Sequence, residues 1–439
     1  MDEVIIMSMR ARTESSWRFL HSWCDDRNRL HGIIATYWDS GESCTVPHVM
    51  NHFPVIEGLR ILYERFGEAV YRDKAVEFSD FLLDSYNNSS RLFENAWGDV
   101  PGKHTGPVHQ SAAAGAILDL YALTGEERYL RVAVESLKSA RHRWPGILLN
   151  GVGNQVLKHI QAIVKLKQLS PSDFLLFKSD IQEFKTQLDT LVRGVPGDGV
   201  LLDQSAYSCL QMTVYEAKCL HGLKALADVD VERNWAVSLM NKMVRGIIDT
   251  FYVGSGIFIS HRDFTHGYAA TLIRYIAGTL RRIPWADKGI WIENLRRYTL
   301  DTVFNPALNL APVWLARMAD LAYVLGEVRP YLKYDVSSVR DETIRNITAK
   351  QLAHGGVPNA GGPWMNGWSA WERLVCCTRW NAYVFRLFCG MSSEKPTLVS
   401  DDIEQCEWGD SFVSVRESQD EVYCRIEASG KEVRWSKPK

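Results

Sequence analysis

Six of the chain's twelve histidines stand in short polar stretches that also carry tryptophans, amides and carboxylates. The densest stretch is GSGIFISHRDFTHGYAATLIRY at residues 254–275, which contains His261, His266 and Tyr268. An imidazole and a phenol placed close together can take a proton from a substrate and give one back, as general acid–base catalysis requires. We therefore predict that this stretch belongs to an active site.

Carboxylates are the second kind of catalytic candidate. An enzyme that hydrolyses glycosidic bonds with inversion needs two of them, one protonated and one ionised, about 6.5–9.5 Å apart. Asp39, Asp99, Asp203, Asp263 and Glu372 all stand close to the start of apolar helical segments. No local spacing singles out a pair, so the sequence favours a histidine- and tyrosine-based reaction over hydrolysis.

An internal repeat indicates how distant residues could be brought together. The segment LYERFGEAVYRDKA at 62–75 is matched by LYALTGEERYLRVA at 120–133 and, with one extra residue, by LAYVLGEVRPYL at 321–332. In each copy an apolar helix is predicted to end at a glycine, because glycine suits the left-handed position that closes a helix. These glycines are Gly67, Gly125 and Gly326.

Two kinds of helix alternate along the chain. Apolar helices, which must be buried, are predicted near 50–66, 108–124, 152–168, 205–227, 266–282, 308–325 and 368–389. Amphipathic helices are predicted near 12–24, 70–86, 127–142, 173–193, 232–251, 287–303 and 337–352. This alternation predicts an all-α fold over residues 1–395, an (α/α)6–7 toroid in which an outer ring of helices surrounds an inner parallel ring. An open helical solenoid is the alternative.

In such a toroid the amino ends of the inner helices meet at one mouth, where free N–H groups and partial positive charge favour an anion or a hydroxyl-rich ligand. Histidine and tryptophan are not preferred helix caps, so their concentration there indicates a pocket. The predicted catalytic residues are His261, His266, Tyr268, His109, Asp39, Asp263 and Glu372. The predicted substrate-binding residues are Asn51, His52, His104, Gln110, Asn154, Gln155, Asp203, Tyr207, Asn309, Trp314, Trp364, Asn366 and Trp368.

The LTGEERYL turn, the alternation of helices and the segment GGVPNAGGPW…TRWNAYVFRLF at 355–388 resemble the six-hairpin glycosidase and terpenoid-cyclase-like toroid proteins. The resemblance covers most of residues 12–390 and concerns architecture. It implies a glycoside hydrolase, a sugar epimerase, a toroidal polysaccharide lyase or a terpenoid cyclase. Residues 254–275 resemble the His-then-Tyr segment of the lyases, which implies that His261 is the base and Tyr268 the proton donor. Asn51 would then neutralise a uronate carboxylate.

The favoured function is a carbohydrate-active enzyme that acts on an acidic or modified saccharide, as a lyase or epimerase before a hydrolase. A second hypothesis is a terpenoid or small-molecule cyclase, because bacterial linalool dehydratase-isomerase is also a toroid. Cys44, Cys209, Tyr207, His109 and Asp39 resemble its set of catalytic residue types. A non-catalytic helical scaffold is the third hypothesis.

Composition excludes other classes of function. Lys plus Arg total 50 against 52 for Asp plus Glu, so no net field favours nucleic acid. No GxGxxG, Walker, HExxH or CxxC motif is present, and we predict neither cofactor nor metal. The sequence holds no apolar window of about 18 residues and no signal-peptide pattern at its start, and its nine cysteines are scattered. We therefore expect a cytoplasmic protein that binds a small molecule or saccharide; the oligomeric state stays open.

After Pro396 the pattern changes to alternating apolar and polar residues. The stretches at 407–417 and 421–426 predict a β-hairpin or a small sheet. Residues 396–439 are too few for an independent domain. We expect this segment to pack on the toroid.

Overall fold

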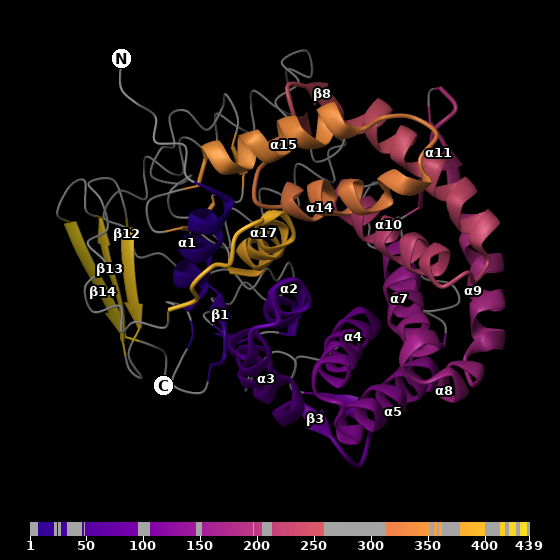
Figure 1. Cartoon of the computed structure of the whole chain (residues 1–439), viewed down its shortest axis with the longest axis horizontal. Coiled ribbons are helices and arrows are strands. Elements are labelled where there is room, and N and C mark those ends of the chain that lie inside the picture. The colour runs from indigo at the N-terminus through magenta and orange to yellow at the C-terminus, as the bar shows by residue number, and fades with distance from the viewer. Residues whose placement is uncertain are drawn as a thin grey trace.

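The structure is a computed structural model of the whole chain (Figure 1). It describes residues 8–21, 24, 28–32, 46–47, 49–94, 106–145, 152–195, 197–203, 213–258, 313–351, 355–357, 360–361, 378–399, 413–417, 421–426 and 431–436. All structural statements below concern these residues.

A closed ring of six helices forms the centre of the described structure (Figure 1). Each contacts the next, and the last contacts the first. In order around the ring they are α2 (Val49–Phe66), α4 (Pro107–Thr124), α7 (Gly153–Leu169), α10 (Thr213–Asp228), α14 (Met318–Val328) and α17 (Thr378–Met391).

A second layer of helices surrounds this ring. It consists of α1 (Met9–His21), α3 (Ala69–Asp84), α5 (Glu127–Arg143), α8 (Pro171–Leu175), α9 (Lys178–Leu191), α11 (Arg233–Phe251) and α15 (Ser337–Ala349). Each inner helix contacts the outer helix next to it in sequence, except that α17 contacts α1 from the other end of the chain. The predicted α/α toroid is therefore confirmed. The additional pair predicted near 266–303 lies outside the described residues, and the ring closes without it because α10 contacts α14 directly.

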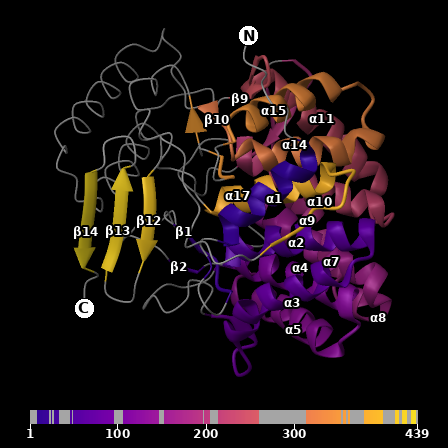
Figure 2. The same ribbon diagram turned by 60° about the vertical axis from the view of Figure 1, so that its left-hand side comes forward.

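The inner helices run in one direction. In Figure 2 the strands β2 (Val46–Pro47) and β10 (Val313–Trp314), which precede α2 and α14, lie towards one side of the ring, whereas α8, which follows α7, lies at the other. The amino ends of these helices therefore share a face, as the sequence predicted.

Glycine ends two of the repeated helices as expected. Gly67 and Gly125 follow α2 and α4 and both have φ of 71°, which is the left-handed conformation that closes a helix. The prediction for Gly326 was wrong: this residue lies inside α14, which continues to Val328 and passes into a short 3₁₀ turn, η3 (Arg329–Tyr331). Pro330 lacks an N–H group and suits the first positions of this turn, so here proline rather than glycine follows the helix end.

Inner helices α7 and α10 approach closely at Gly222. A Cβ atom there would lie 2.5 Å from the carbonyl oxygen of Leu157. We expect Gly222→Ala to destabilise the protein by about 1–3 kcal/mol, because the two backbones would have to move apart. Gly194→Ala is the control, since a Cβ atom there meets nothing within 4 Å. Urea denaturation should separate the two variants, and equal midpoints would contradict this account of the contact.

Short antiparallel strand pairs follow three of the outer helices. They are β3 (Tyr86–Asn87) with β4 (Leu92–Phe93), β6 (Val192–Gly194) with β7 (Val200–Leu202), and β8 (Tyr252–Gly254) with β9 (Ile257–Phe258). Two longer-range pairs join β1 (His31–Gly32) to β2 and β10 to β11 (Ala360–Gly361). The sequence did not predict these strands, which are too short to show an alternating pattern.

The carboxyl-terminal residues form the predicted sheet, with one strand more than a hairpin. Strands β12 (Val413–Glu417), β13 (Glu421–Ile426) and β14 (Lys431–Ser436) pair antiparallel in that order. That the sheet packs on the toroid stays a prediction. Among the described residues, no helix has both the length and the apolar character needed to cross a bilayer.

Candidate functional site

Most of the predicted site residues lie outside the described residues. They are His261, His266, Tyr268, Asp39, Asp263, Glu372, His104, Tyr207, Asn309, Trp364, Asn366 and Trp368. Trp314 is described in its backbone, which pairs with Ala360. The side chains of seven others are described: Asn51, His52, His109, Gln110, Asn154, Gln155 and Asp203.

Several of these polar side chains hold the segments that lead into the inner helices. At the start of α2, Asn51 donates to the carbonyl oxygen of Leu30 at 3.1 Å, and His52 Nε2 accepts from the Leu30 N–H at 3.0 Å. The His52 ring also stacks on Phe81 of the outer helix α3. Together the two side chains satisfy the backbone N–H and C=O groups of Leu30, as a neighbouring strand would.

The same device recurs around the ring. Gln110 of α4 accepts from the N–H of Phe93 at 2.8 Å and donates to its carbonyl at 2.9 Å. Asn381 of α17 makes the equivalent pair of bonds to Val357, at 2.7 and 3.0 Å. Amides at the heads of inner helices thus have a structural use, because each satisfies the backbone of an incoming segment.

Three other predicted residues also have defined places. Asp203 forms an ion pair with Arg193 at 3.0 Å, next to the β6–β7 hairpin. Asn154 and Gln155 are buried in the first turn of α7. None of these three shows a contact with the charged centre of the ring described below.

His109 differs because charged residues of other inner helices change its pKa. Burial, with smaller effects from Arg379 and Lys218 on other inner helices, lowers its pKa to about 3. Its Nδ1 accepts a hydrogen bond from the Gly106 N–H at 3.1 Å. His109 is therefore a neutral imidazole close to two cations.

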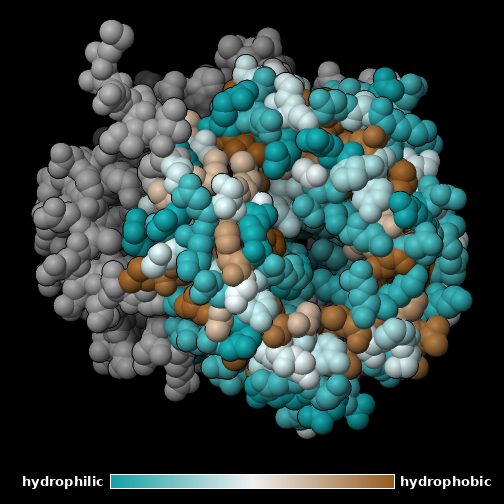
Figure 3. Space-filling model, in the orientation of Figure 1, coloured by the Kyte–Doolittle hydropathy of each residue, from teal (hydrophilic) through white to brown (hydrophobic). Residues whose placement is uncertain are grey.

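Charged residues line the inside of the ring, which sequence reasoning missed. They occur on one face of three inner helices at spacings of three and four residues: Glu57, Arg60 and Glu64 on α2; Lys158, Gln161 and Lys165 on α7; Lys218, His221 and Lys224 on α10. Such a stripe in an apolar helix indicates a polar lumen. Figure 3 shows the toroid hollowed at its centre, with mostly hydrophilic residues around the hollow.

Two small cavities with charged side chains in their walls lie within this lumen. The first, which we call the upper cavity, lies nearer the amino ends of the inner helices, since first-turn residues of α2 and α4 line it. Its other lining residues include Lys218, His221, Asp320, Tyr383 and Arg386. The lower cavity is lined by polar groups of α2, α4 and α7, and Lys158 and Gln161 line both cavities. In each cavity the volume open to the centre of a water molecule is about 10 Å³. Each therefore has room for about one water molecule.

Arg386 joins four inner helices at this level. It donates to Glu57 of α2 at 2.6 Å and to Asp320 of α14, and Asp320 also bonds His221 Nε2 of α10 at 2.8 Å. Burial alone would raise the pKa values of both carboxyls. The cations outweigh it, with Arg386 largest for Glu57 and His221 largest for Asp320, and hold both pKa values well below the ordinary range.

A second group of ion pairs lies deeper in the lumen. Asp119 of α4 bonds Lys165 of α7 at 2.7 Å and lies 3.2 Å from Arg60 of α2. Every described charge at this level has a partner of opposite sign, so the group serves to join helices.

The upper cavity is different because its lysines exceed its acids. Lys158 donates to Gln161 at 2.9 Å, and burial lowers its pKa to about 8. Burial and then the neighbouring Arg379 lower the pKa of Lys218 to about 7. The two carboxylates near these lysines, Glu57 and Asp320, are already bound to Arg386.

The first described turn of α17 adds buried donors with no partner among the described residues. They are Thr378 Oγ1, Arg379 Nε, Trp380 Nε1 and, one turn on, Tyr383 Oη. Trp380 is only 4% exposed, and the guanidinium groups of Arg317 and Arg379 lie 4.7 and 5.2 Å from its ring centre. Unpaired buried donors next to cations make a site for an anion.

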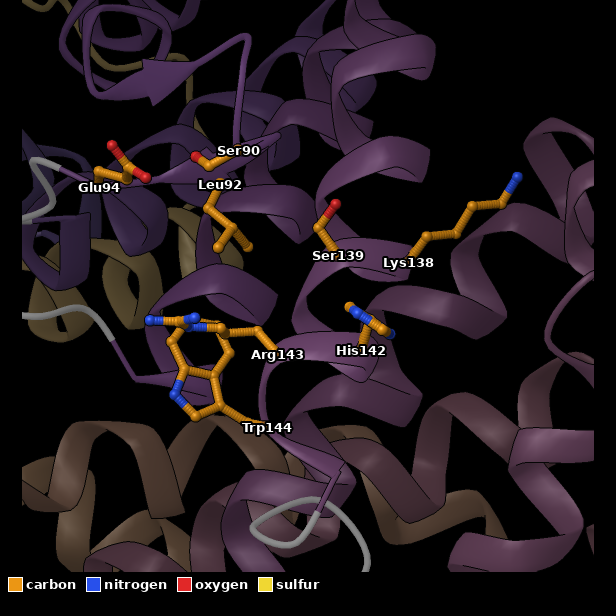
Figure 4. A pocket seen from close by; sticks show the side chains of 8 residues that line it. All are labelled: Ser90, Leu92, Glu94, Lys138, Ser139, His142, Arg143 and Trp144. Carbon is orange, nitrogen blue, oxygen red and sulfur yellow. The ribbon is translucent and has the colours of Figure 1, made fainter.

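A larger cleft lies on the outer wall (Figure 4). It is bounded by the β3–β4 hairpin and the end of α5, with Lys138, His142, Arg143 and Trp144 on one side. Lys138, His142 and Arg143 are exposed. The cleft therefore lacks the buried acid–base groups of the lumen, which we take as the candidate active site.

Comparison with known proteins agrees with the architecture. No protein-family model and no curated protein matches the sequence. Solved structures do match. A glycosidase in complex with glucose is 10% identical with a TM-score of 0.55, covering 89% of this chain and 98% of its own. This likeness shows a shared α/α toroid fold. An unsaturated glucuronyl hydrolase specific for heparin (9% identity, TM-score 0.52, 89% and 98%) and a polysaccharide lyase (9%, 0.51, 88% and 98%) share it.

Proposed function

We propose that the protein is a carbohydrate-active enzyme that acts on an acidic saccharide by general acid–base chemistry, as a lyase or epimerase before a hydrolase. The observation that carries the proposal is the excess of cations around the upper cavity. Lys158, Lys218 and Arg379 have no ion pair among the described residues. Of the three, Lys218 is buried, and a buried cation without an ion pair is costly. A bound carboxylate would remove that cost.

The upper cavity also holds acid–base groups. His221 is oriented by its bond to Asp320, and Tyr383 presents a buried phenol whose pKa is raised by burial and by Asp320. His261, His266, Tyr268, Asp39, Asp263 and Glu372 lie outside the described residues and stay proposed members of the site. His261 and Tyr268 stay the proposed base and acid of an elimination.

The lining argues against the two alternatives. A terpenoid cyclase needs an apolar cavity, whereas the described lumen is charged from Lys218 to Asp119. A scaffold has no use for unpaired buried donors. Likeness in fold leaves the reaction open, so the proposal depends on the site.

We assign the substrate anion to Arg379, whose planar guanidinium group matches a carboxylate in geometry. Arg379→Gln is expected to raise KM for an acidic saccharide roughly 10- to 100-fold, which corresponds to about 1.5–3 kcal/mol for a charge-assisted bond. Arg193→Gln, on the outer hairpin, is the control.

The activity itself is tested with a panel of uronate-containing and neutral saccharides. Elimination is followed as near-ultraviolet absorbance of an unsaturated uronate, and epimerisation by proton NMR. Equal turnover of neutral and acidic sugars, or an unchanged KM in Arg379→Gln, would refute the role of the anion. Failure to convert any saccharide would reject the proposed class.

A further inference from the structure

Lys218 and His221 form an unusual pair in the upper cavity. They stand one turn apart on α10, both line the cavity, and Tyr383 lines it from α17. Lys218 is 6% exposed and His221 is 8% exposed. An amine, an imidazole and a phenol therefore border the same water-sized space.

Lys218 makes no hydrogen bond or ion pair within the described part of the chain. Its Nζ lies 5.7 Å from the ring centres of Tyr215 and Trp380. The nearby carboxylate of Asp320 is already bound to His221 and Arg386. A buried lysine held in this way has no evident structural purpose, because replacing it by an apolar residue would remove a desolvated charge.

We propose that Lys218 is a nucleophile that forms an imine with the carbonyl carbon of an open-chain sugar, with His221 moving the protons. The proposal rests on the proposed function for its substrate class. The cavity has room for the carbonyl end only, and the rest of the sugar would lie above it, towards the amino ends of the inner helices.

The step balances as follows. The lone pair of Lys218 Nζ forms the C–N bond, and the carbonyl oxygen takes a proton from Tyr383 or His221. In the resulting carbinolamine one proton passes from the nitrogen through His221 to this oxygen, which then leaves as water while the nitrogen lone pair forms the protonated imine. Hydrolysis reverses each transfer and returns the amine, so no oxidant or reductant is needed.

The imine has a use in the favoured reactions. A protonated imine withdraws electrons from the neighbouring carbon and makes its C–H bond more acidic. Epimerisation and β-elimination both begin by breaking such a bond, whereas hydrolysis does not. His221, oriented by Asp320, borders the same space as Lys218 and moves the protons of the imine step.

The electrostatic surroundings favour the neutral amine that the attack requires. Burial and Arg379, with smaller effects from Lys158 and Arg317, lower the pKa of Lys218 to about 7, and Asp320 opposes them. An exposed lysine has a pKa of about 10.4. Desolvation next to another cation is a known way to activate a lysine nucleophile.

The test is reductive trapping of the full-length protein. D-Glucose and D-glucuronic acid are incubated with the protein and sodium cyanoborohydride, and modified lysines are located by peptide mass spectrometry. We expect one sugar on Lys218, with labelling that rises through pH 7 and is lost in Lys218→Gln. Lys242→Gln, which removes an exposed lysine of α11, should keep the label on Lys218.

Label spread over exposed lysines, or a labelling rate that rises only near pH 10, would overturn the proposal. Near-ultraviolet circular dichroism of Lys218→Gln and Lys218→Arg confirms that each variant is folded before its loss of label is counted. The two proposals fail separately. Trapping on Lys218 without turnover of any acidic saccharide would reject the substrate class, and turnover that cyanoborohydride leaves unchanged would reject the imine.

Discussion

Arg386→Leu is expected to destabilise the protein by about 3–5 kcal/mol, the cost of leaving buried carboxylates without their cation. The side chain of Arg386 is 2% exposed, and its partners Glu57 and Asp320 are 11% and 1% exposed. Because these three residues belong to α2, α14 and α17, their loss weakens the closure of the ring between its last helices and its first. The measurement is the urea midpoint, followed by circular dichroism.

The control is Arg72→Leu on the outer helix α3. Arg72 also forms an ion pair, at 2.8 Å to Asp73, but its side chain is 39% exposed. Its replacement should change stability by less than about 0.5 kcal/mol. Equal effects of the two variants would show that the buried network does not hold the ring. A double-mutant cycle with Glu57→Gln isolates the Arg386–Glu57 interaction.

The same network sets a dependence on pH. The pKa values of Glu57 and Asp320 lie below their ordinary values in the folded state, so unfolding takes up protons once the pH falls below about 4. The stability that these carboxylates provide is complete above that pH and is lost as the pH decreases further. The free energy of unfolding of Arg386→Leu should therefore decrease less than that of the wild type between neutral and acid pH.

The periodicity of the sequence was sufficient to predict the architecture. Helix burial depends on local apolar spacing, and the predicted helices near 50–66 and 127–142 match α2 and α5 closely. The number of helices in the ring depends instead on which helices touch. That α10 contacts α14 follows from tertiary packing, which no local pattern contains.

Predicting the site was harder, because polar residues at helix starts have two uses. Asn51 and Gln110 were predicted to bind substrate because they stand at the heads of inner helices. In the structure they bond the backbone of Leu30 and Phe93. The sequence did not predict Lys158 and Lys218 as site residues, because a lysine in a helix usually faces solvent. Their spacing from Gln161 and His221, one turn further on, was the available clue, since an inward stripe of this kind has meaning only once the ring is known to close.

Lys218→Met is expected to lower turnover at least about 100-fold, as for the loss of a group that acts at the reacting centre, and at the same time to stabilise the protein. Methionine has a similar length and carries no charge, so the variant avoids the desolvation of an unpaired ammonium group. The expected gain is about 1–3 kcal/mol, or a rise in Tm of roughly 1–4 °C. Lys242→Met on the exposed face of α11 is the control and should change neither quantity.

The sign of the pH effect distinguishes this explanation from better packing alone. The pKa of Lys218 is about 7 in the folded protein and about 10.4 in the unfolded chain, so unfolding takes up a proton between these values. The buried amine therefore costs the wild type most below pH 7, and the cost disappears as the pH approaches 10. The advantage of Lys218→Met should shrink over the same interval. An advantage that stays constant from pH 6 to pH 10 would mean that the amine of Lys218 is not desolvated, and the reason for assigning it a chemical role would be lost.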